Sequence, residues 1–332
     1  MNALEKGAIL VTGGAGFIGS ALVWRLNEKG FDDIVVSDFL GTEEKWRNLV
    51  PLAFRDYIEA DELIARLESD PPCLGEIGTV LHLGACSATT ETDAGYLVRN
   101  NFEYTKRLAS WAFERGARFI YASSAATYGD GANGMDDDID SLQALRPLNM
   151  YGYSKHLFDL YARRKGWFKK IVGLKYFNVY GPNENHKGDM RSLVNKAFGQ
   201  ILETGKVRLF RSDKPEYRDG EQMRDFLYVK DAVDMTLHFA ENTSEGGLFN
   251  IGSGEANTWL TLTEAIFDAL DRKPDIEFID MPESIREKYQ YHTCADITRL
   301  LETGYDGKYR PLPDAVADYV QNYLVPGRHL GE

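Results

Sequence analysis

A tyrosine and a lysine four residues apart, Tyr151 and Lys155, are the most informative pair of side chains in this sequence. On a helix, residues at this spacing lie one turn apart on the same face. A tyrosine hydroxyl has a pKa of about 10 and is a poor base at neutral pH, but a neighbouring ammonium lowers that pKa. We therefore expect Tyr151 to transfer a proton with the help of Lys155. Tyr153 competes for this role, but the residue four positions after it is Leu157.

A serine and a histidine stand in two of the apolar runs. Ser124 belongs to the stretch Ala122-Ser-Ser-Ala-Ala-Thr-Tyr128 at the end of such a run. There its hydroxyl is able to hydrogen-bond a reacting oxygen. His82 lies within another run, and we expect it to be a buried residue of the core, not a catalyst.

Three glycines, Gly13, Gly16 and Gly19, stand between an apolar run and a helical pattern. In such a unit the first glycine allows a tight turn, the second lets the backbone approach a pyrophosphate, and the third lets helix and strand pack closely. Free N–H groups and the helix dipole then attract the phosphates. The segment therefore predicts a dinucleotide site, and together with the Tyr/Lys pair it predicts hydride transfer.

The type of dinucleotide stays open on residue chemistry alone. Asp38 ends the second expected strand, nineteen residues after Gly19, where a ribose hydroxyl would lie. An acid there favours NAD because it repels a 2′-phosphate. Lys45 and Arg47 follow closely and could neutralise that phosphate, and Asp38 could equally be a strand-end cap.

A parallel sheet would bring these residues together. The strands expected from apolar runs are 8–11, 34–36, 79–83, 118–122 and 171–175, and the expected helices are 17–29, 93–115 and the one that carries Lys155. Strands that alternate with helices predict an α/β fold with a doubly wound parallel Rossmann sheet. Its strand carboxyl ends, and its ligand, would lie along one edge.

The pattern loosens after Phe177 and predicts a second, smaller, mixed α/β substrate domain. We expect a polar loop at 178–188, a charged insertion at 211–223, helices at 191–204, 231–241, 261–270 and 313–323, and a strand at 248–251 that returns to the main sheet. The NAD(P)-binding Rossmann domain is expected over 1–177, with 226–256 returning to it. The substrate domain is expected over 178–225 and 257–332.

Composition excludes several classes of protein. The chain has 332 residues and a formal net charge of -13, whereas a nucleic-acid binder needs a basic footprint. We expect no membrane partner, because no stretch approaches the roughly 18 to 20 apolar residues of a membrane span. Residues 1–7 hold no apolar signal region. Cys73, Cys86 and Cys294 are too few and too scattered for a disulfide framework or a zinc site, so we expect a cytoplasmic protein without a metal.

Over nearly its whole length the sequence resembles the extended short-chain dehydrogenase/reductase superfamily and, within it, the ADP-heptose 6-epimerases of lipopolysaccharide core-precursor synthesis. The segments that carry the resemblance are Gly84-Ala-Cys-Ser-Ala-Thr-Thr-Glu91, Tyr121-Ala-Ser-Ser-Ala-Ala-Thr-Tyr-Gly129, Tyr151-Gly-Tyr-Ser-Lys155, Tyr176-Phe-Asn-Val-Tyr-Gly-Pro182, His186-Lys-Gly188 and Arg224-Asp-Phe226. The fourth and sixth segments are shared widely among nucleotide-sugar epimerases and dehydratases. The first and fifth are much more particular to the heptose enzymes.

The resemblance implies that Tyr151 and Lys187 are alternative acid/base residues on opposite faces of the sugar, with Lys155 and Ser124 supporting the oxygen. It implies a tightly bound cofactor, usually NADP in this family, with NAD possible. The implied cofactor-binding residues are Gly13, Gly16, Phe17, Ile18, Gly19, Asp38, Phe39, Lys45, Leu83, Gly84, Ala85, Cys86, Ser87, Asn100, Tyr151, Lys155, Val179 and Lys187. The residues implied to bind ADP-heptose are Ser124, Asn178, Asp189, Lys196, Phe210, Arg211, Ser212, Asp213, Arg224 and Tyr289. Homo-oligomers, pentamers in particular, are also implied.

The sequence departs from the family pattern at three positions. Asp189 replaces a usual serine, Lys196 stands where a substrate-contacting histidine is usual, and Ala60 stands where a basic cofactor contact is usual. The last departure weakens the prediction of NADP. The insertion at 211–223 is also longer and more charged than expected.

Basic residues are concentrated in the expected substrate segments, where they would attract an anionic ADP-sugar to an acidic protein. They are Lys187, Arg191, Lys196, Arg211, Arg218 and Arg224. Without the resemblance, Lys187 is typical of a solvated loop, and Arg211 and Arg218 are typical of scattered surface charges. Arg224 precedes the apolar run 226–229, which favours a buried phosphate ligand.

The expected chemistry is inversion of an alcohol centre. A carbinol carbon without an adjacent carbonyl cannot be inverted by simple deprotonation, but removal of its hydride gives a ketone that accepts the hydride back on the other face. The alternatives are a UDP-hexose 4-epimerase, a 4,6-dehydratase and a dinucleotide-sensing regulator. A dehydratase would usually have acidic residues in place of Ala125 and Ala126, and a regulator would not need Tyr151 and Lys155.

Overall fold

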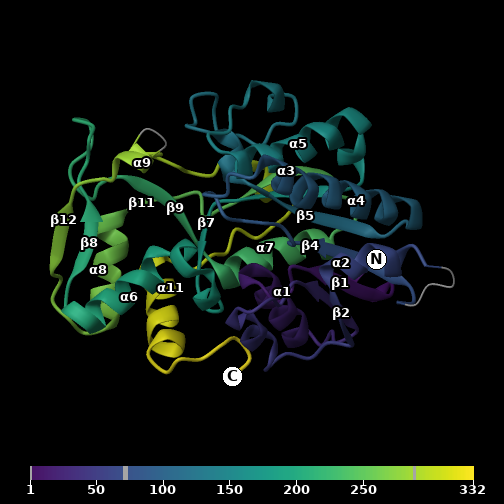
Figure 1. The fold of residues 1–332 in the computed structure, drawn as a ribbon, viewed down its shortest axis with the longest axis horizontal. Coiled ribbons are helices and arrows are strands. Elements are labelled where there is room, and N and C mark those ends of the chain that lie inside the picture. Colours follow the sequence, from purple (N-terminus) through teal and green to yellow (C-terminus); the bar gives the residue numbers. More distant parts are fainter. Residues whose placement is uncertain (1, 70–73, 287–288) are drawn as a thin grey trace.

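The computed structural model describes residues 2–69, 74–286 and 289–332, so Cys73 lies outside the described residues. Its centre is a parallel sheet of seven strands in the order β10-β6-β5-β4-β1-β2-β3 (Figure 1). The strands are β1 (Ala8–Thr12), β2 (Ile34–Asp38), β3 (Asp56–Glu59), β4 (Ile77–His82), β5 (Arg118–Ser124), β6 (Val172–Tyr176) and β10 (Gly247–Ile251). The predicted Rossmann sheet is confirmed.

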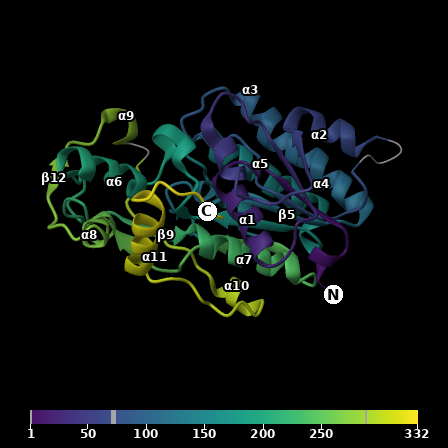
Figure 2. The ribbon, with the colours of Figure 1, turned by 90° about the horizontal axis from the view of Figure 1, so that it is seen from below.

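Helices cover both faces of this sheet because its strands are apolar on both sides. In β1, Ile9 and Val11 belong to one core cluster with α1 (Phe17–Glu28) and α7 (Val229–Glu241). Ala8 and Leu10 belong to a second cluster with α2 (Ala60–Leu67), α4 (Tyr104–Arg115) and α5 (Met150–Lys165). Alternate side chains of a strand point to opposite faces, so the two clusters lie on opposite sides of the sheet (Figure 2).

A smaller region of mixed structure lies beyond one side of the sheet, on the left of Figure 1. It contains the strand pair β8 (Val207–Phe210) and β12 (Ile276–Ile279), which is parallel. Around this pair lie α6 (Leu193–Thr204), α8 (Trp259–Ala269) and α11 (Leu312–Tyr319). Between the two regions, β9 (Met223–Tyr228) pairs in parallel with β7 (Asn178–Tyr180) and antiparallel with β11 (Ala256–Thr258).

Several local expectations can be compared with these elements. The strand expected at 248–251 is β10, and it pairs with β6, which confirms its return to the main sheet. The helix expected at 93–115 is not uniform, because α3 (Ala94–Leu97) and α4 are joined by a π-helical turn at Val98–Glu103. The elements β3, α2, β8 and β12 were not expected. The domain boundaries stay a prediction.

His82 is the buried core residue that was expected. Its Nδ1 lies 2.6 Å from Thr12 Oγ1 and its Nε2 lies 2.8 Å from Thr105 Oγ1, so both ring nitrogens have partners. Burial lowers the pKa of His82 to about 3, which keeps the ring neutral at physiological pH. The ring therefore links the carboxyl ends of β1 and β4 to α4. Within the described residues, no helix is both long enough and apolar enough to cross a membrane.

Candidate active site

The glycine loop after β1 is packed so tightly that side chains would not fit. Gly13 has φ +67, and a Cβ atom on it would lie 2.7 Å from the backbone nitrogen of Gly84. A Cβ atom on Gly19 would lie 2.0 Å from the carbonyl oxygen of Gly13. The loop therefore brings β1, α1 and the end of β4 into backbone contact, as a dinucleotide fold requires.

The first turn of α1 can accept an anion. Gly16 is its N-cap residue and makes no side-chain cap hydrogen bond, so N–H groups of this turn have no intrahelical or capping partner. Together with the helix dipole, such groups form a phosphate site. Phe17, Ile18 and Gly19 make up this turn, and the residues present fit the pyrophosphate of a dinucleotide.

Asp38 is tied to the glycine loop. Its carboxylate accepts hydrogen bonds from the backbone N–H groups of Ala15 (3.0 Å) and Gly16 (3.1 Å) and from that of Phe39 (2.7 Å). The ammonium of Lys45 lies 2.8 Å from the same carboxylate. Arg47 instead pairs with Glu44 on the surface. Asp38 thus fixes the loop, and its charge is already balanced by Lys45.

The Tyr/Lys pair lies at the carboxyl end of β5. The Ser124 side chain favours the ionised form of the Tyr151 hydroxyl, and the Lys155 ammonium donates to the carbonyl oxygen of Ala122 (2.8 Å). Burial raises the pKa of Tyr151 in this structure. Burial is the largest effect on Tyr151, and the Lys155 ammonium bonds to the strand. The lowering expected from Lys155 together with a positive nicotinamide ring stays a prediction for the protein with its cofactor bound.

The segment after β4 is held by a residue that the sequence did not single out. Asn101, in the π-helical turn, accepts from the N–H of Cys86 (2.8 Å) and donates to its carbonyl oxygen (2.9 Å). It also donates to Ser154 Oγ (2.9 Å) of α5, and Asn100 donates to it (3.2 Å). The turn thus fixes Cys86, in the segment after β4, beside the Tyr/Lys helix. A π-helical turn often marks a functional site, but its sequence carries no clear signal.

Lys187 lies beside the glycine loop. Its ammonium is 5.0 Å from the centre of the Phe17 ring, and burial lowers its pKa. It is therefore not the solvated loop lysine that its sequence context alone suggests. Buried Glu184 accepts from the N–H and hydroxyl of Ser192, both at 2.6 Å, and so anchors this loop to the start of α6. Within the described residues, no hydrogen bond joins Lys187 to Tyr151.

Arg224 has the features of an anion ligand. It is 6% exposed, and its guanidinium lies 5.1 Å from the Tyr289 ring centre and 5.7 Å from that of Trp259. Its one side-chain hydrogen bond goes to the carbonyl oxygen of Met223 (2.8 Å), and in the part of the chain that the structure describes it forms no ion pair. The ring of Phe210 lies 6.5 Å from that of Tyr289. A buried cation without an anionic partner is costly, so an anionic ligand would stabilise it.

The other residues expected to bind substrate are more exposed. Arg211 pairs with Asp280 (3.1 Å), and Asp213 pairs with Arg286 (2.9 Å). The hydroxyl of Ser212, between them, donates to the Lys214 carbonyl oxygen. Arg211 is therefore an exposed, paired side chain in this structure, and its role in substrate binding stays a prediction.

Asn178 and Asp189 are exposed, and Val179 and Lys196 are partly buried. The Lys196 ammonium lies 3.3 Å from the Asp189 carbonyl oxygen. Of the six basic residues, Arg224 and Lys187 are the ones whose pKa burial lowers, and neither forms an ion pair among the described residues.

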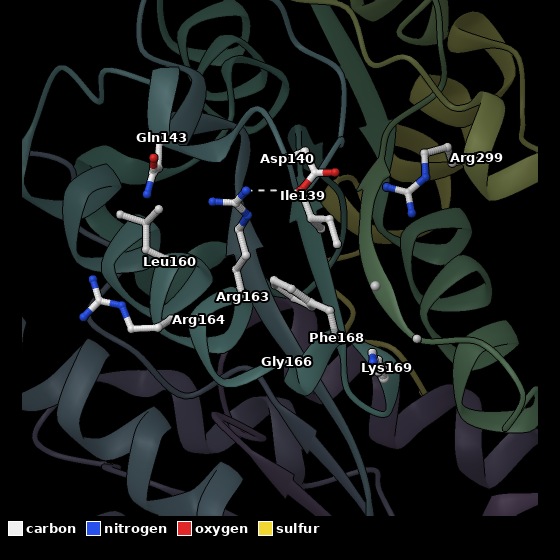
Figure 3. A pocket seen from close by; sticks show the side chains of 12 residues that line it. Ile139, Asp140, Gln143, Leu160, Arg163, Arg164, Gly166, Phe168, Lys169 and Arg299 are labelled. Atoms are coloured by element: carbon white, nitrogen blue, oxygen red, sulfur yellow. Dashed lines mark hydrogen bonds and ion pairs between the residues drawn. The ribbon is translucent and has the colours of Figure 1, made fainter.

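A cavity of about 590 Å³ lies elsewhere. It is lined by Arg163 and Arg164 in the last turn of α5 and by Phe168 and Lys169 just after that helix (Figure 3). Gly246 and Gly247, at the start of β10, also line it. These positions are at the amino ends of strands, on the edge opposite Tyr151. Arg163 is paired with Asp140 (3.1 Å), and Arg299 donates to the backbone of Asp137 and Leu248. No residue of the proposed site lines this cavity.

Comparison with known proteins agrees with this arrangement. The NAD dependent epimerase/dehydratase family matches residues 9–252. The chain belongs to this family. It is 54% identical over 317 residues to an ADP-L-glycero-D-manno-heptose-6-epimerase of Nitratidesulfovibrio vulgaris, covering 95% of this chain and 98% of that relative.

Two solved structures of family members share the whole fold. An ADP-L-glycero-D-manno-heptose-6-epimerase of Helicobacter pylori superposes with a TM-score of 0.81 at 28% identity, over 97% of each chain. A UDP-glucuronic acid 4-epimerase of Bacillus cereus, solved with NAD and a UDP-sugar, superposes with a TM-score of 0.75 at 26% identity, over 96% of this chain and 99% of that one. The family therefore uses a nicotinamide dinucleotide on this fold.

The contact between Gly19 and Gly13 makes a direct prediction. A methyl group in Gly19→Ala has no room, so we expect the free energy of unfolding to fall by about 1–3 kcal/mol. We also expect less dinucleotide to co-purify, measured after release by denaturation. Gly199→Ala is the matched control in α6, where an added Cβ meets nothing within 4 Å. Its stability should be equal or higher by up to about 1 kcal/mol. Equal denaturation curves for both variants would contradict the tight-packing argument.

Proposed function

We propose that this chain is an ADP-L-glycero-D-manno-heptose 6-epimerase that interconverts ADP-D-glycero- and ADP-L-glycero-β-D-manno-heptose. The observation that carries the proposal is 54% identity over 95% of the chain with a relative of that name. The site geometry supports it, because a Tyr/Ser pair at the end of β5 lies on the same sheet edge as the glycine loop. This chemistry needs no metal.

The proposed mechanism is transient oxidation at C6. The bound nicotinamide ring supplies hydride acceptance and hydride return. Tyr151, whose ionised form Ser124 favours, exchanges the proton of the C6 hydroxyl on one face of the sugar. Lys187 does so on the other face after the 6-keto sugar has turned. The lowered pKa of Lys187 suits this role, because a catalyst must both gain and lose its proton near neutral pH.

We propose that the cofactor is NADP, with NAD as the alternative. The ion pair between Lys45 and Asp38, at 2.8 Å, supports NADP because it reduces the repulsion between the Asp38 carboxylate and a 2′-phosphate. The glycine loop would hold the pyrophosphate, and the segment 83–87 and Asn100 would approach the nicotinamide half. Ala60, at the start of α2, offers no charge to the 2′-phosphate, so Lys45 would have to supply it.

We propose that Arg224 binds the pyrophosphate of the ADP-sugar. Its burial without an anionic partner supports this role, and Tyr289 and Phe210 would pack against the adenosine half. Asn178, Asp189, Lys196 and the segment 211–213 would complete the site when the loops close on the substrate.

The remaining parts of the proposal concern the whole molecule. Residues 1–177 and 226–256 would form the cofactor domain, and 178–225 and 257–332 the substrate domain. We further propose a cytoplasmic homo-oligomer, a pentamer in particular, acting in lipopolysaccharide core-precursor synthesis.

The function is tested by incubating the purified protein with ADP-D-glycero-D-manno-heptose and following the C6 centre by NMR. We expect conversion to an equilibrium mixture of the two epimers without added cofactor. UDP-glucose and UDP-galactose are the parallel substrates. Inversion of a hexose nucleotide with no change at C6 of the heptose would make the protein a different epimerase of the same family.

If two residues exchange the proton, removal of either one should lower the rate of epimerisation to a similar extent. Tyr151→Phe should lower kcat at least ~100-fold, because the hydroxyl that moves the proton is gone. Lys187→Met should lower net epimerisation to a similar extent, because protonation from the second face is lost. Lys206→Met, at an exposed position before β8, is the control and should keep the wild-type rate. Near-wild-type turnover by Lys187→Met would contradict a role for two residues.

The two arginines of the segment around β9 should behave differently. Arg224→Gln removes a buried charge from the proposed pyrophosphate site, and KM for the ADP-sugar should rise about 10- to 100-fold. Arg218→Gln removes a side chain that is 89% exposed, and KM should stay the same. Steady-state kinetics at constant ionic strength measures both. Equal effects of the two substitutions would show attraction by general charge instead of a specific phosphate contact.

A further inference from the structure

The helix α5 is joined to the strand β5 by a ladder of contacts that begins at the proposed catalytic tyrosine. Tyr151, Lys155 and Asp159 are spaced four residues apart and so share one face of α5. Ser124 favours the ionised form of Tyr151, and Lys155 donates to the carbonyl oxygen of Ala122.

Asp159 makes the last contacts of this series, and both of its carboxylate oxygens accept hydrogen bonds from β5. The Tyr121 hydroxyl donates to Oδ1 (2.6 Å), and the Ser123 hydroxyl donates to Oδ2 (2.7 Å). Tyr121, Ala122 and Ser123 therefore each bond to the same face of α5. Asp159 is 0% exposed, so water cannot replace these two hydrogen bonds. They therefore fix the position of α5 along β5. That position decides whether Tyr151 meets Ser124.

The same carboxylate acts on two buried ammonium groups, those of Lys155 and Lys175. Lys175 of β6, the strand next to β5, is also 0% exposed, and its Nζ lies 3.8 Å from Asp159 Oδ2. Lys175 also donates to Thr127 Oγ1 and lies 4.2 Å from the centre of the Tyr128 ring. Burial lowers the pKa of Lys155 and of Lys175 to about 8, and Asp159 acts against this effect on both. Without Asp159, two desolvated ammonium groups would share a region with no anion in direct contact.

We propose that Asp159 is a positioning residue of the epimerase, which holds α5 in register on β5 and keeps Lys155 charged beside Tyr151. Lys175 is the partner that retains the Asp159 carboxylate in the core. This inference rests on the proposed function, since it concerns the same tyrosine and lysine. Asp159 itself does not touch the reacting atoms.

The other ionisable groups around this pair are few. The groups that interact with Asp159, Lys155 or Lys175 come from α5, β4, β5, β6 and the segments at 84–91 and 125–137: His82, Cys86, Tyr121, Tyr128, Asp136, Asp137 and His156. Asp159 raises the pKa of both lysines, but Asp136 and Asp137 also act on Lys175, whereas no other aspartate of the described residues acts on Lys155. Loss of the Asp159 charge should therefore leave Lys155 without an aspartate, while Lys175 keeps two.

The test is the pH dependence of kcat for Asp159→Asn, measured with ADP-heptose on the complete protein. The pKa of Lys155 should fall once its anion is gone, so the charged form is lost at a lower pH. The alkaline limb of kcat should move down by at least about one pH unit, which is the usual size of such an effect. KM for the sugar should not change, because the nucleotide contacts are remote.

Tyr121→Phe is the matched control, because it removes a hydrogen bond to the same carboxylate but keeps the charge. It should lower the melting temperature without moving the alkaline limb. If Asp159→Asn does not fold, the double variant Asp159→Asn/Lys175→Met is measured instead. It leaves no unpaired ammonium of Lys175 in the core, yet Lys155 still lacks its anion and the limb should stay at the lower pH.

Two results would overturn the inference. One is a wild-type alkaline limb in both Asp159 variants. The other is an equal shift in Tyr121→Phe, because then the hydrogen bond and not the charge would matter. If the wild-type protein inverts a hexose nucleotide and not the heptose, the proposed function is wrong, and the same pH comparison is then made with that hexose nucleotide.

Discussion

The backbone contact between Gly13, Gly19 and Gly84 is the constraint on which the rest of the site depends. A Cβ atom at Gly19 would meet the Gly13 carbonyl oxygen at 2.0 Å, so β1 and α1 can meet only without side chains. The contact places the N-terminus of α1 at the carboxyl edge of the sheet. At the same edge, β4 ends at His82 and β5 ends at Ser124. A dinucleotide on this turn would extend along that edge towards Tyr151.

The main elements of the fold could be predicted from the sequence because they are long or wholly buried. β1, β2 and β6 are buried at every position, and such strands appear as continuous apolar runs. β3 reads Asp-Tyr-Ile-Glu with one buried residue, and β12 has none. Edge strands of this kind lack an apolar signal, and only their pairing partners define them. The π-helical turn at Val98–Glu103 has no periodic signature either.

Site residues could be predicted from the sequence where the chemistry demands a particular residue type. Residues that only position another side chain through hydrogen bonds could not. Glycines, Tyr151, Lys155 and Arg224 stand in recognisable local contexts. Asn101, Glu184 and Asp159 do not, because their partners lie on other elements and become neighbours only in the folded chain. The burial that raises the pKa of Tyr151 could not be predicted for the same reason, since a helix pattern does not show what packs against a side chain.

An acidic protein that binds an anionic sugar nucleotide requires local charges that are not already neutralised. Most basic side chains here do not meet this condition, since Arg25, Arg211 and Arg310, for example, are each paired with aspartates. Arg224 and Lys187 meet it, because each is desolvated and, among the described residues, forms no ion pair. The net charge of -13 therefore does not oppose binding at this site. An unpaired buried cation raises the energy of the empty protein, and an anion that fits beside it lowers that energy directly.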